Sequence, residues 1–262
     1  MKAIIVSAGQ GRRLLPLTTR IPKCMLPVLG DRPVLEMQLR ALAECGIDRA
    51  TVVVGFAAEI VERFLEHNPI AGLETRTLFN PFYSLSDNLA TCWLASSEMH
   101  DDFILLNGDT LFESAVLQRL LSAPAAPLTV AINEKREYDD DDMKVSLNGG
   151  RRLRAVGKTL DPELIDGESI GLMRFCGHGA AAFREGLEAA IRHPDGLRAW
   201  YLSVVNAMAE TLPIETASIT GLWWGEIDSR EDLASVRIAL EKREKKRRPR
   251  VHAPPSREGI GH

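Results

Sequence analysis

The sequence lacks long hydrophobic runs: none of its 262 residues lies in a stretch that approaches the roughly 18 uninterrupted apolar residues of a membrane span. Cysteine is scarce, with four residues far apart and no C-x-x-C pair, which argues against a disulfide framework and a thiolate zinc site. The N-terminus shows neither the hydrophobic segment nor the cleavage site of a signal peptide. We therefore expect a cytoplasmic protein without a membrane partner.

The residues that are present suit an ordinary globular protein, because 45% are hydrophobic and 26% are charged. The net charge of −4 is unevenly distributed: residues 241–250 carry +5, and residues 1–240 carry −9. An acidic body predicts no nucleic-acid partner. We expect residues 241–262 to form a basic, flexible tail, in which a solvated helix end frays into a proline-containing terminus.

Buried-type strands and amphipathic helices alternate at short intervals in residues 1–127, which predicts a doubly wound, mostly parallel α/β sheet of the Rossmann-like type. The expected strands are residues 2–7, 50–54, 73–78 and 103–106, and the expected helices are residues 33–45, 57–65, 87–97 and 113–121. Asp31 and Asp87 are candidate caps for two of these helices.

The pattern changes in residues 128–240, where short strand-like runs precede two further helical stretches and a last helix. The expected strands are residues 128–133, 143–147, 153–157, 170–175 and 214–219, and the expected helices are residues 179–192, 197–210 and 229–242. We interpret this half as a small α+β extension of the same sheet, so that residues 1–240 form a single domain.

A glycine-rich loop follows the first strand, with Gly9 and Gly11 at its start. Glycines at such a junction let backbone N–H groups approach phosphates closely. A dinucleotide fingerprint would need a small residue in place of Leu14 and a helix at once, which the prolines that follow prevent. The lysine and hydroxyl of a Walker A loop are absent.

Four cations occupy this loop in an otherwise acidic body: Arg12, Arg13, Arg20 and Lys23. They could simply face water, but binding of a polyphosphate explains their concentration better, because arginine forms charge-assisted hydrogen bonds with phosphate and lysine supplies a point charge. The loop therefore predicts a phosphate site.

Carboxylates stand at two later strand ends, Asp109 after residues 103–106 and Asp228 after an extended stretch. Glu226 shares a face with Asp228 if that stretch is a strand. Ligands of open α/β sheets bind beyond the carboxyl ends of the strands, and Mg²⁺ prefers a few carboxylates together with phosphate oxygens. Either aspartate could instead cap the following helix.

The loop pattern resembles the signature of nucleotidyltransferases that join a nucleoside triphosphate to a phosphorylated acceptor, the sugar-1-phosphate type. The matching residues are Gly9, Gly11, Arg13, Leu14, Pro16, Leu17, Thr18, Pro22 and Lys23. Ser7 and Arg12 depart from the usual pattern, where alanine and a hydroxyl residue stand.

This resemblance assigns roles to the loop and to the carboxylates. It implies that Arg13 and Lys23 hold the triphosphate, and that Asp109 and Asp228 bind Mg²⁺, with Glu226 assisting or orienting Asp228. The nucleotide-binding residues that it implies are Ala8, Gly9, Gly11, Arg12, Arg13, Lys23 and Asn88. Asn88 could equally serve as a helix cap.

A wider resemblance, over about residues 1–240, is to the branch of phosphocholine and phosphonate cytidylyltransferases. The stretches that carry it are residues 80–84, 87–89, 142–145, 157–158 and 168–172. It implies a nucleotide-binding half at residues 1–127 and an acceptor-binding half at residues 128–240, and it favours CTP over UTP or dTTP.

On the acceptor side, the resemblance implies that Lys158 holds the acceptor phosphate and that Glu168 faces a cationic head group. Trp224 is a candidate for cation–π contact with a quaternary ammonium, as are Trp200, Tyr201 and Trp223, although core packing is the alternative for at least two of the four. The acidic run 139–142 is a solvated loop, or else attracts an amine-bearing acceptor or a second Mg²⁺.

The sequence thus predicts an enzyme, a Mg²⁺-dependent cytidylyltransferase acting on CTP and a small phosphate or phosphonate such as phosphocholine or 2-aminoethylphosphonate. Two alternatives stay open, a sugar-1-phosphate nucleotidyltransferase and a non-catalytic nucleotide-binding regulatory module. The sequence leaves the acceptor and the oligomeric state undetermined, with a homodimer among the alternatives.

Overall fold

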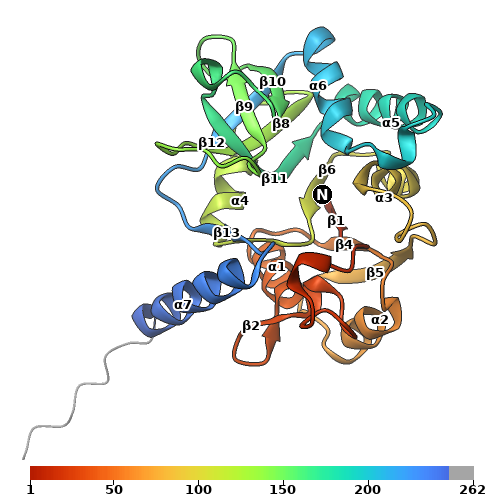
Figure 1. Ribbon diagram of the computed structural model, residues 1–262, viewed down its shortest axis with the longest axis vertical. Coiled ribbons are helices and arrows are strands. Elements are labelled where there is room, and N and C mark those ends of the chain that lie inside the picture. The colour runs from red at the N-terminus through yellow and green to blue at the C-terminus, as the bar shows by residue number, and fades with distance from the viewer. Residues whose placement is uncertain (248–262) are drawn as a thin grey trace, which may run out of the picture.

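The centre of the molecule is a mixed sheet whose first four strands are parallel (Figure 1). The computed structural model describes residues 1–247. β1 (Lys2–Val6) lies between β4 (Arg49–Val54) and β6 (Phe103–Asn107), and β5 (Glu74–Phe79) extends the sheet beyond β4. All four predicted strands of the first half are therefore present, in the parallel arrangement that alternating helices require.

The second half continues the sheet with antiparallel pairing. β11 (Gly167–Phe175) runs antiparallel to β6 and also pairs with β8 (Leu128–Asn133) and β9 (Lys144–Leu147). β10 (Leu153–Gly157) pairs with β9, and β12 (Ile214–Ser218) runs parallel to β8. The two halves thus share one sheet, as the sequence predicted.

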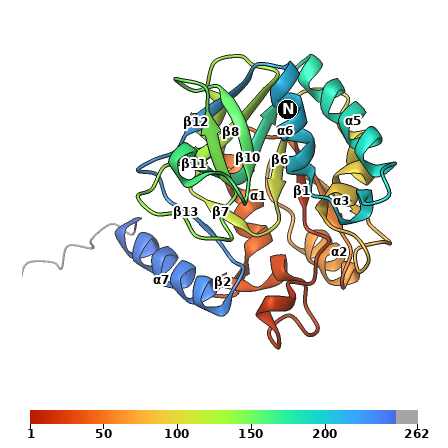
Figure 2. The ribbon, with the colours of Figure 1, turned by 45° about the horizontal axis from the view of Figure 1, so that its top comes forward.

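Helices cover both faces of the sheet (Figures 1 and 2). α1 (Val34–Glu44), α2 (Ala58–His67) and α4 (Ser114–Leu121) pack on one face, and α3 (Asn88–Leu94), α5 (His178–Ile191) and α6 (Tyr201–Thr211) pack on the other. Successive strand residues alternate between these two cores: Ile5 of β1 belongs to the first and Ile4 to the second. Burial on both faces explains why β1, β4 and β6 read as nearly continuous apolar runs.

A third core holds α7 (Arg230–Arg247) against two small sheets. These are the hairpin of β2 (Pro27–Leu29) with β3 (Arg32–Pro33), and the pair of β7 (Thr110–Phe112) with β13 (Trp224–Glu226). Leu233, Val236 and Leu240 form the buried stripe of α7. The spacing of three and four residues puts these side chains on one side of the helix.

Several predicted boundaries need correction. The predicted helix 197–210 begins only at Tyr201, after a 3₁₀ turn at Gly196–Arg198, and the predicted helix 87–97 ends at Leu94, where a 3₁₀ turn follows. Neither Asp31 nor Asp87 caps a helix through its side chain. The last helix continues to Arg247, so residues 241–247 of the predicted tail are helical, and the remainder of that tail lies outside the described residues.

The short strands β2, β3 and β7 were not predicted, since two or three residues are too few to show a period. Among the described residues, no helix is both long enough and apolar enough to cross a membrane.

Truncation of the α7 stripe tests this docking. We expect Leu233→Ala, at a side chain that is 2% exposed, to lower the free energy of unfolding by about 2–4 kcal/mol, because it leaves a cavity in the third core. Ile238→Ala on the same helix, at a side chain that is 53% exposed, should change it by less than about 0.5 kcal/mol. Urea denaturation measures both, and equal losses would contradict the packing described.

Candidate active site

The glycine loop turns back on itself directly after β1. Gly11 has a φ of 73°, a left-handed conformation that glycine adopts without steric cost. A Cβ at this position would lie 3.0 Å from the Cβ of Lys23, so the absence of a side chain makes room for the lysine stem. The Thr18 hydroxyl donates to the carbonyl oxygen of Gly11 at 2.9 Å and closes the loop.

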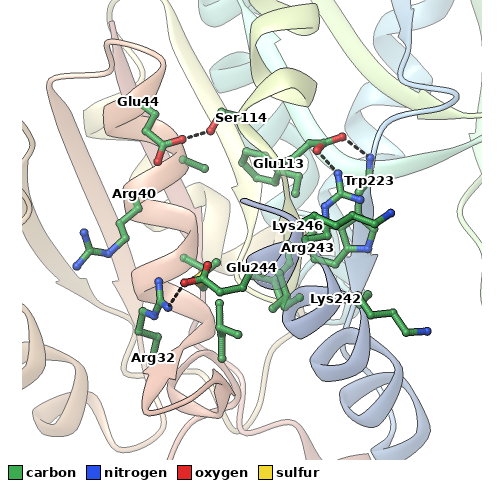
Figure 3. Close-up of a pocket in the computed structure, with 17 residues that line it drawn as sticks. Arg32, Arg40, Glu44, Glu113, Ser114, Trp223, Lys242, Arg243, Glu244 and Lys246 are labelled. Carbon is green, nitrogen blue, oxygen red and sulfur yellow. Dashed lines mark hydrogen bonds and ion pairs between the residues drawn. The ribbon is translucent and has the colours of Figure 1, made fainter. Parts of the chain in front are cut away.

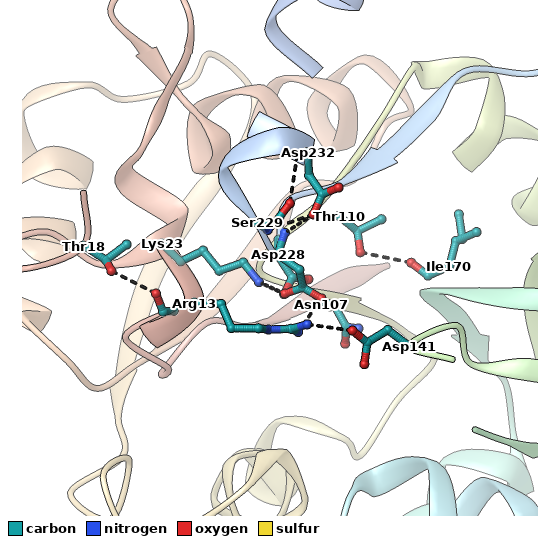
Figure 4. Close-up of polar contacts among 12 residues, drawn as sticks. Arg13, Thr18, Lys23, Asn107, Thr110, Asp141, Ile170, Asp228, Ser229 and Asp232 are labelled. Carbon is teal, nitrogen blue, oxygen red and sulfur yellow. Dashed lines mark hydrogen bonds and ion pairs between the residues drawn. The ribbon is translucent and has the colours of Figure 1, made fainter. Parts of the chain in front are cut away.

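Lys23 lies at the centre of the site, between two aspartates (Figure 4). Its Nζ is 2.6 Å from Asp109 Oδ2 and 2.5 Å from Asp228 Oδ1. Burial opposes the charge of this side chain, but the two carboxylates together raise the pKa of Lys23 above its ordinary value. Lys23 is therefore a permanent ammonium that holds two strand ends together.

The pairing of β7 with β13 explains why two aspartates 119 positions apart meet. Asp109 directly precedes β7, and Asp228 follows β13 by two residues. The strands run antiparallel with Thr110 opposite Glu226, so the start of one lies beside the end of the other. The same register brings Glu226 to this end of the pair.

These three carboxylates are suited to a divalent cation. One oxygen from each of Asp109, Glu226 and Asp228 lies within 4.8 Å of the others. The Oδ1 atom of Asp109 is buried and has no hydrogen-bond partner among the described residues. Mg²⁺ prefers such hard oxygen ligands, so the donor set fits this ion.

Glu226 has a strongly raised pKa. Burial, followed by the charges of Asp109 and Asp228, raises the pKa of Glu226 to about 8. Three carboxylates around one ammonium would leave an excess of negative charge, and a proton on Glu226 relieves it.

Arg13 and Lys158 extend the charged network towards the second half of the sheet, residues 128–240. Arg13 contacts Asp228 through Nη2 at 2.8 Å and Asp141 through Nη1 at 2.9 Å. The other oxygen of Asp141 is 2.9 Å from Nζ of Lys158, which lies over the ring of Trp200. A row of alternating charges therefore runs from Asp109 to Lys158, part of which is visible in Figure 4.

The loop cations Arg12 and Arg20 are exposed and make no ion pair with another described residue. Of the four predicted cations, Arg13 and Lys23 therefore contact the carboxylates, and the other two lie at the surface. Ala8 is buried, and its carbonyl oxygen accepts a hydrogen bond from the backbone of Phe56.

Glu168 lies in β11, and its carboxylate already has partners. Asn133 donates to Oε1 at 2.9 Å, and Nζ of Lys135 is 2.7 Å from Oε2. Lys135 also pairs with Asp142 at 2.8 Å. Glu168 is thus one member of a paired cluster of two carboxylates and one ammonium rather than a free anion.

Asn88 joins α3 to α6, since its Oδ1 accepts a hydrogen bond from the backbone N–H of Tyr201 at 3.0 Å.

The Tyr201 ring is fully buried, and its hydroxyl donates to Asn107 at 2.8 Å, so this side chain is core rather than part of an aromatic cage. Trp224 packs against the first core, and Trp223 lies beneath the Arg243 guanidinium, near α7. The four aromatic candidates therefore do not converge, and Trp200 alone of them lies beside Lys158.

Sequence reasoning missed two contributors, Asp141 and Asn107. Asp141 was hidden within a run of four aspartates, where nothing marks one carboxylate as special. Asn107 ends β6 and orients Tyr201, and it packs so closely on Gly171 that a Cβ there would collide with its amide. Only the pairing of β6 with β11 reveals that contact.

Cys24 has no part in the chemistry, although it follows Lys23 in the sequence. The thiol is 1% exposed, and burial raises its pKa to about 11. A thiol in this state is a poor nucleophile.

A cavity of about 580 Å³ lies between α1 and α7, and Trp223 is the one aromatic candidate among its described lining residues (Figure 3). Glu113 spans its floor, because its carboxylate accepts from the backbone N–H of Trp223 and pairs with Arg243. Arg32 pairs with Glu244 across its mouth at 3.6 Å. These contacts join α7 to the strands that carry the carboxylates.

The raised pKa of Glu226 predicts a pH dependence of stability. The unfolded chain releases this proton near pH 4.5, whereas the folded chain keeps it to about pH 8, so folding is favoured below 4.5 and the advantage is lost as the pH rises through 8. Glu226→Gln cannot ionise and should remove this slope, which amounts to about 1 kcal/mol per pH unit or less. Urea denaturation in EDTA measures it, and parallel curves for both proteins would contradict the assignment.

Comparison with known proteins identifies the fold. The inositol-1-phosphate CTP transferase of T. maritima superposes with a TM-score of 0.77 at 20% identity, over 92% of this chain and 95% of that chain. The CTP:phosphocholine cytidylyltransferase LicC of Streptococcus pneumoniae superposes with a TM-score of 0.72 at 20% identity, over 91% and 98%.

Two curated relatives are more similar in sequence over shorter stretches. The CMP-5'-(3-aminopropyl)phosphonate synthase of Streptomyces rubellomurinus is 39% identical over 149 residues, which are 57% of this chain and 23% of that protein. The choline-phosphate cytidylyltransferase of Streptococcus pneumoniae is 31% identical over 114 residues, 44% of this chain and 47% of that protein. The alignments thus span half or less of these two relatives.

The family model described as nucleotidyl transferase matches residues 2–139, which include the glycine loop, Lys23 and Asp109. The match covers more than half of the chain and agrees with the resemblance that the loop signature indicated. The chain therefore belongs to the nucleotidyl transferase family.

Proposed function

We propose that the protein is a Mg²⁺-dependent cytidylyltransferase that joins CTP to a small phosphate or phosphonate acceptor and releases pyrophosphate. The observation that carries this proposal is the position of Lys23 between Asp109 and Asp228, with Arg13 and Lys158 reaching the same place from different halves of the sheet. A transfer between two anionic substrates needs cations from both sides and carboxylates for a metal ion.

The nucleotide side of the reaction is assigned to the loop after β1. Arg13 and Lys23 neutralise the triphosphate, and the backbone of residues 8–12 lines the nucleotide, with Asn88 at the nearby start of α3. Asp109, Asp228 and Glu226 would hold Mg²⁺, which supplies further neutralisation of charge on the phosphates. As a ligand of such a cation, Glu226 would be ionised, because the charge of the ion would favour its carboxylate form.

The acceptor side is assigned to Lys158 together with Trp200. An oxygen of the acceptor attacks the α-phosphorus of CTP, a new P–O bond forms, and the bond to the β-phosphate breaks as pyrophosphate leaves. The attacking oxygen is already anionic, so the step needs no general base and no nucleophile from the protein. Catalysis consists of positioning and charge neutralisation by Arg13, Lys23 and Lys158.

The names of the relatives support CTP and a nitrogen-bearing acceptor. They include a CMP-5'-(3-aminopropyl)phosphonate synthase, a choline-phosphate cytidylyltransferase and a CTP:phosphoglutamine cytidylyltransferase of Campylobacter jejuni. Phosphocholine, 2-aminoethylphosphonate and related compounds are therefore the first acceptors to test.

The alternative within the same fold is a sugar-1-phosphate nucleotidyltransferase. A structure described as a putative glucose-1-phosphate thymidylyltransferase from Bacillus anthracis superposes with a TM-score of 0.76, at 17% identity over 91% of this chain and 94% of that chain. Release of pyrophosphate separates the two functions when CTP, UTP and dTTP are each paired with phosphocholine, aminoethylphosphonate and hexose 1-phosphates. Turnover only with a hexose 1-phosphate would overturn the proposal, and binding of CTP without turnover of any acceptor would indicate a regulatory module.

Asp109→Asn tests the proposed metal site. We expect kcat to fall by about a hundredfold or more, because the variant loses a charge that positions both Lys23 and the cation. Asp101→Asn is the control, since Asp101 is an exposed aspartate outside the site. Thermal unfolding reports whether both variants are folded, and near-normal turnover by a folded Asp109→Asn protein would refute the assignment.

Lys158→Ala tests the acceptor site. The KM for the acceptor should rise about tenfold or more while the KM for CTP changes little, because a charge-assisted contact with only one substrate is lost. Steady-state kinetics with each substrate varied in turn provides the measurement. An equal rise in both KM values would place Lys158 on the nucleotide instead.

A further inference from the structure

The acidic run 139–142 forms a turn with a fixed base. Lys144 is 7% exposed, and its Nζ donates to the carbonyl oxygens of Asp139 at 2.6 Å and Lys158 at 3.0 Å. Asp142 accepts from the backbone N–H of Asp139 at 2.6 Å and pairs with Lys135. A buried lysine thus fastens this turn to the strand end that carries Lys158.

The tip of the turn reaches the nucleotide-binding loop through one side chain. The Oδ2 atom of Asp141 is 2.9 Å from Arg13, and its Oδ1 atom is 2.9 Å from Lys158. Asp140 is also exposed but makes no ion pair with another described residue. One carboxylate of the run therefore bridges the two halves of the molecule, and its neighbour does not.

The two cations that Asp141 joins are those assigned to different substrates, Arg13 to the triphosphate and Lys158 to the acceptor phosphate. A carboxylate resembles a phosphoryl group in offering two anionic oxygens to such donors. We propose that Asp141 is an internal phosphate mimic, which each substrate displaces from its cation and which thereby couples the binding of the two substrates. This inference rests on the proposed function.

The sign of the coupling follows from the geometry. Triphosphate at Arg13 removes one of the two contacts that hold Asp141, so the acceptor phosphate then competes with a carboxylate held by Lys158 alone. The reverse order gives the same advantage, because coupling between two binding equilibria is reciprocal. Exposed ion pairs are weak, and Asp141 is therefore displaced readily rather than blocking the site.

Asp141→Asn tests the mimic, because asparagine keeps the size of the side chain and removes its charge. We expect its dissociation constant for CTP with Mg²⁺ to fall about two- to fivefold, the factor that corresponds to one exposed ion pair. Saturating CTP should tighten the binding of inorganic phosphate, the acceptor probe, in the wild type and much less in Asp141→Asn.

Asp140→Asn is the matched control, since it removes the same charge one residue away. It should bind both ligands as the wild type does. An equal increase in affinity in the two variants would show that the loss of any negative charge in the run has this effect, and it would overturn the proposal. Weaker binding by Asp141→Asn would also overturn it, by showing that Asp141 contacts a substrate or its metal ion.

Pyrophosphate, measured in the same titrations, separates this proposal from the proposed function. In one outcome, the protein does not turn over CTP, but Asp141→Asn alone binds pyrophosphate more tightly. This outcome would support the role of Asp141 as a phosphate mimic and would refute the proposed cytidylyltransferase activity. In the opposite outcome, the wild type turns over CTP, and Asp141→Asn and Asp140→Asn have identical binding constants. This outcome would support the proposed enzymatic activity and would refute the role of Asp141 as a phosphate mimic.

Discussion

The contact of Lys23 with Asp109 and Asp228 is the constraint on which the site depends. It joins three segments that are far apart in the chain: the loop after β1, the turn between β6 and β7, and the end of β13. Two carboxylates so close together would repel each other without a cation between them. The lysine therefore keeps the two carboxylates close together.

The rest of the fold is arranged around this contact. The parallel strands bring the glycine loop and Asp109 to the same edge of the sheet, since β1 and β6 are neighbours. The pairing of β7 with β13 adds Asp228 and Glu226, and the packing of α7 in the third core holds that pair in place. Residues 128–240 contribute Lys158 through the antiparallel continuation of the sheet. Each half thus supplies part of one charged network.

The contrast between Glu226 and Glu168 shows how burial and charge decide the state of a carboxyl group. Glu226 lies beside Asp109 and Asp228, and its raised pKa keeps it protonated at neutral pH. Glu168 is more deeply buried, but Asn133 and Lys135 satisfy its two oxygens. The same residue type therefore lies beside two other carboxylates in one place and between an amide and an ammonium in the other.

The sequence by itself determined the alternation of strands and helices, because apolar periodicity and helix-ending glycines are local signals. It also indicated Lys23, Arg13, Asp109, Asp228 and Lys158, through a loop signature and through positions at strand ends. The tertiary structure alone decided which of these side chains meet. It singled out Asp141 from a run of identical residues, and it withdrew Tyr201 and Trp223 from the aromatic candidates. Contacts between residues more than 100 positions apart depend on which strands pair, and the apolar pattern within one strand does not specify its partner.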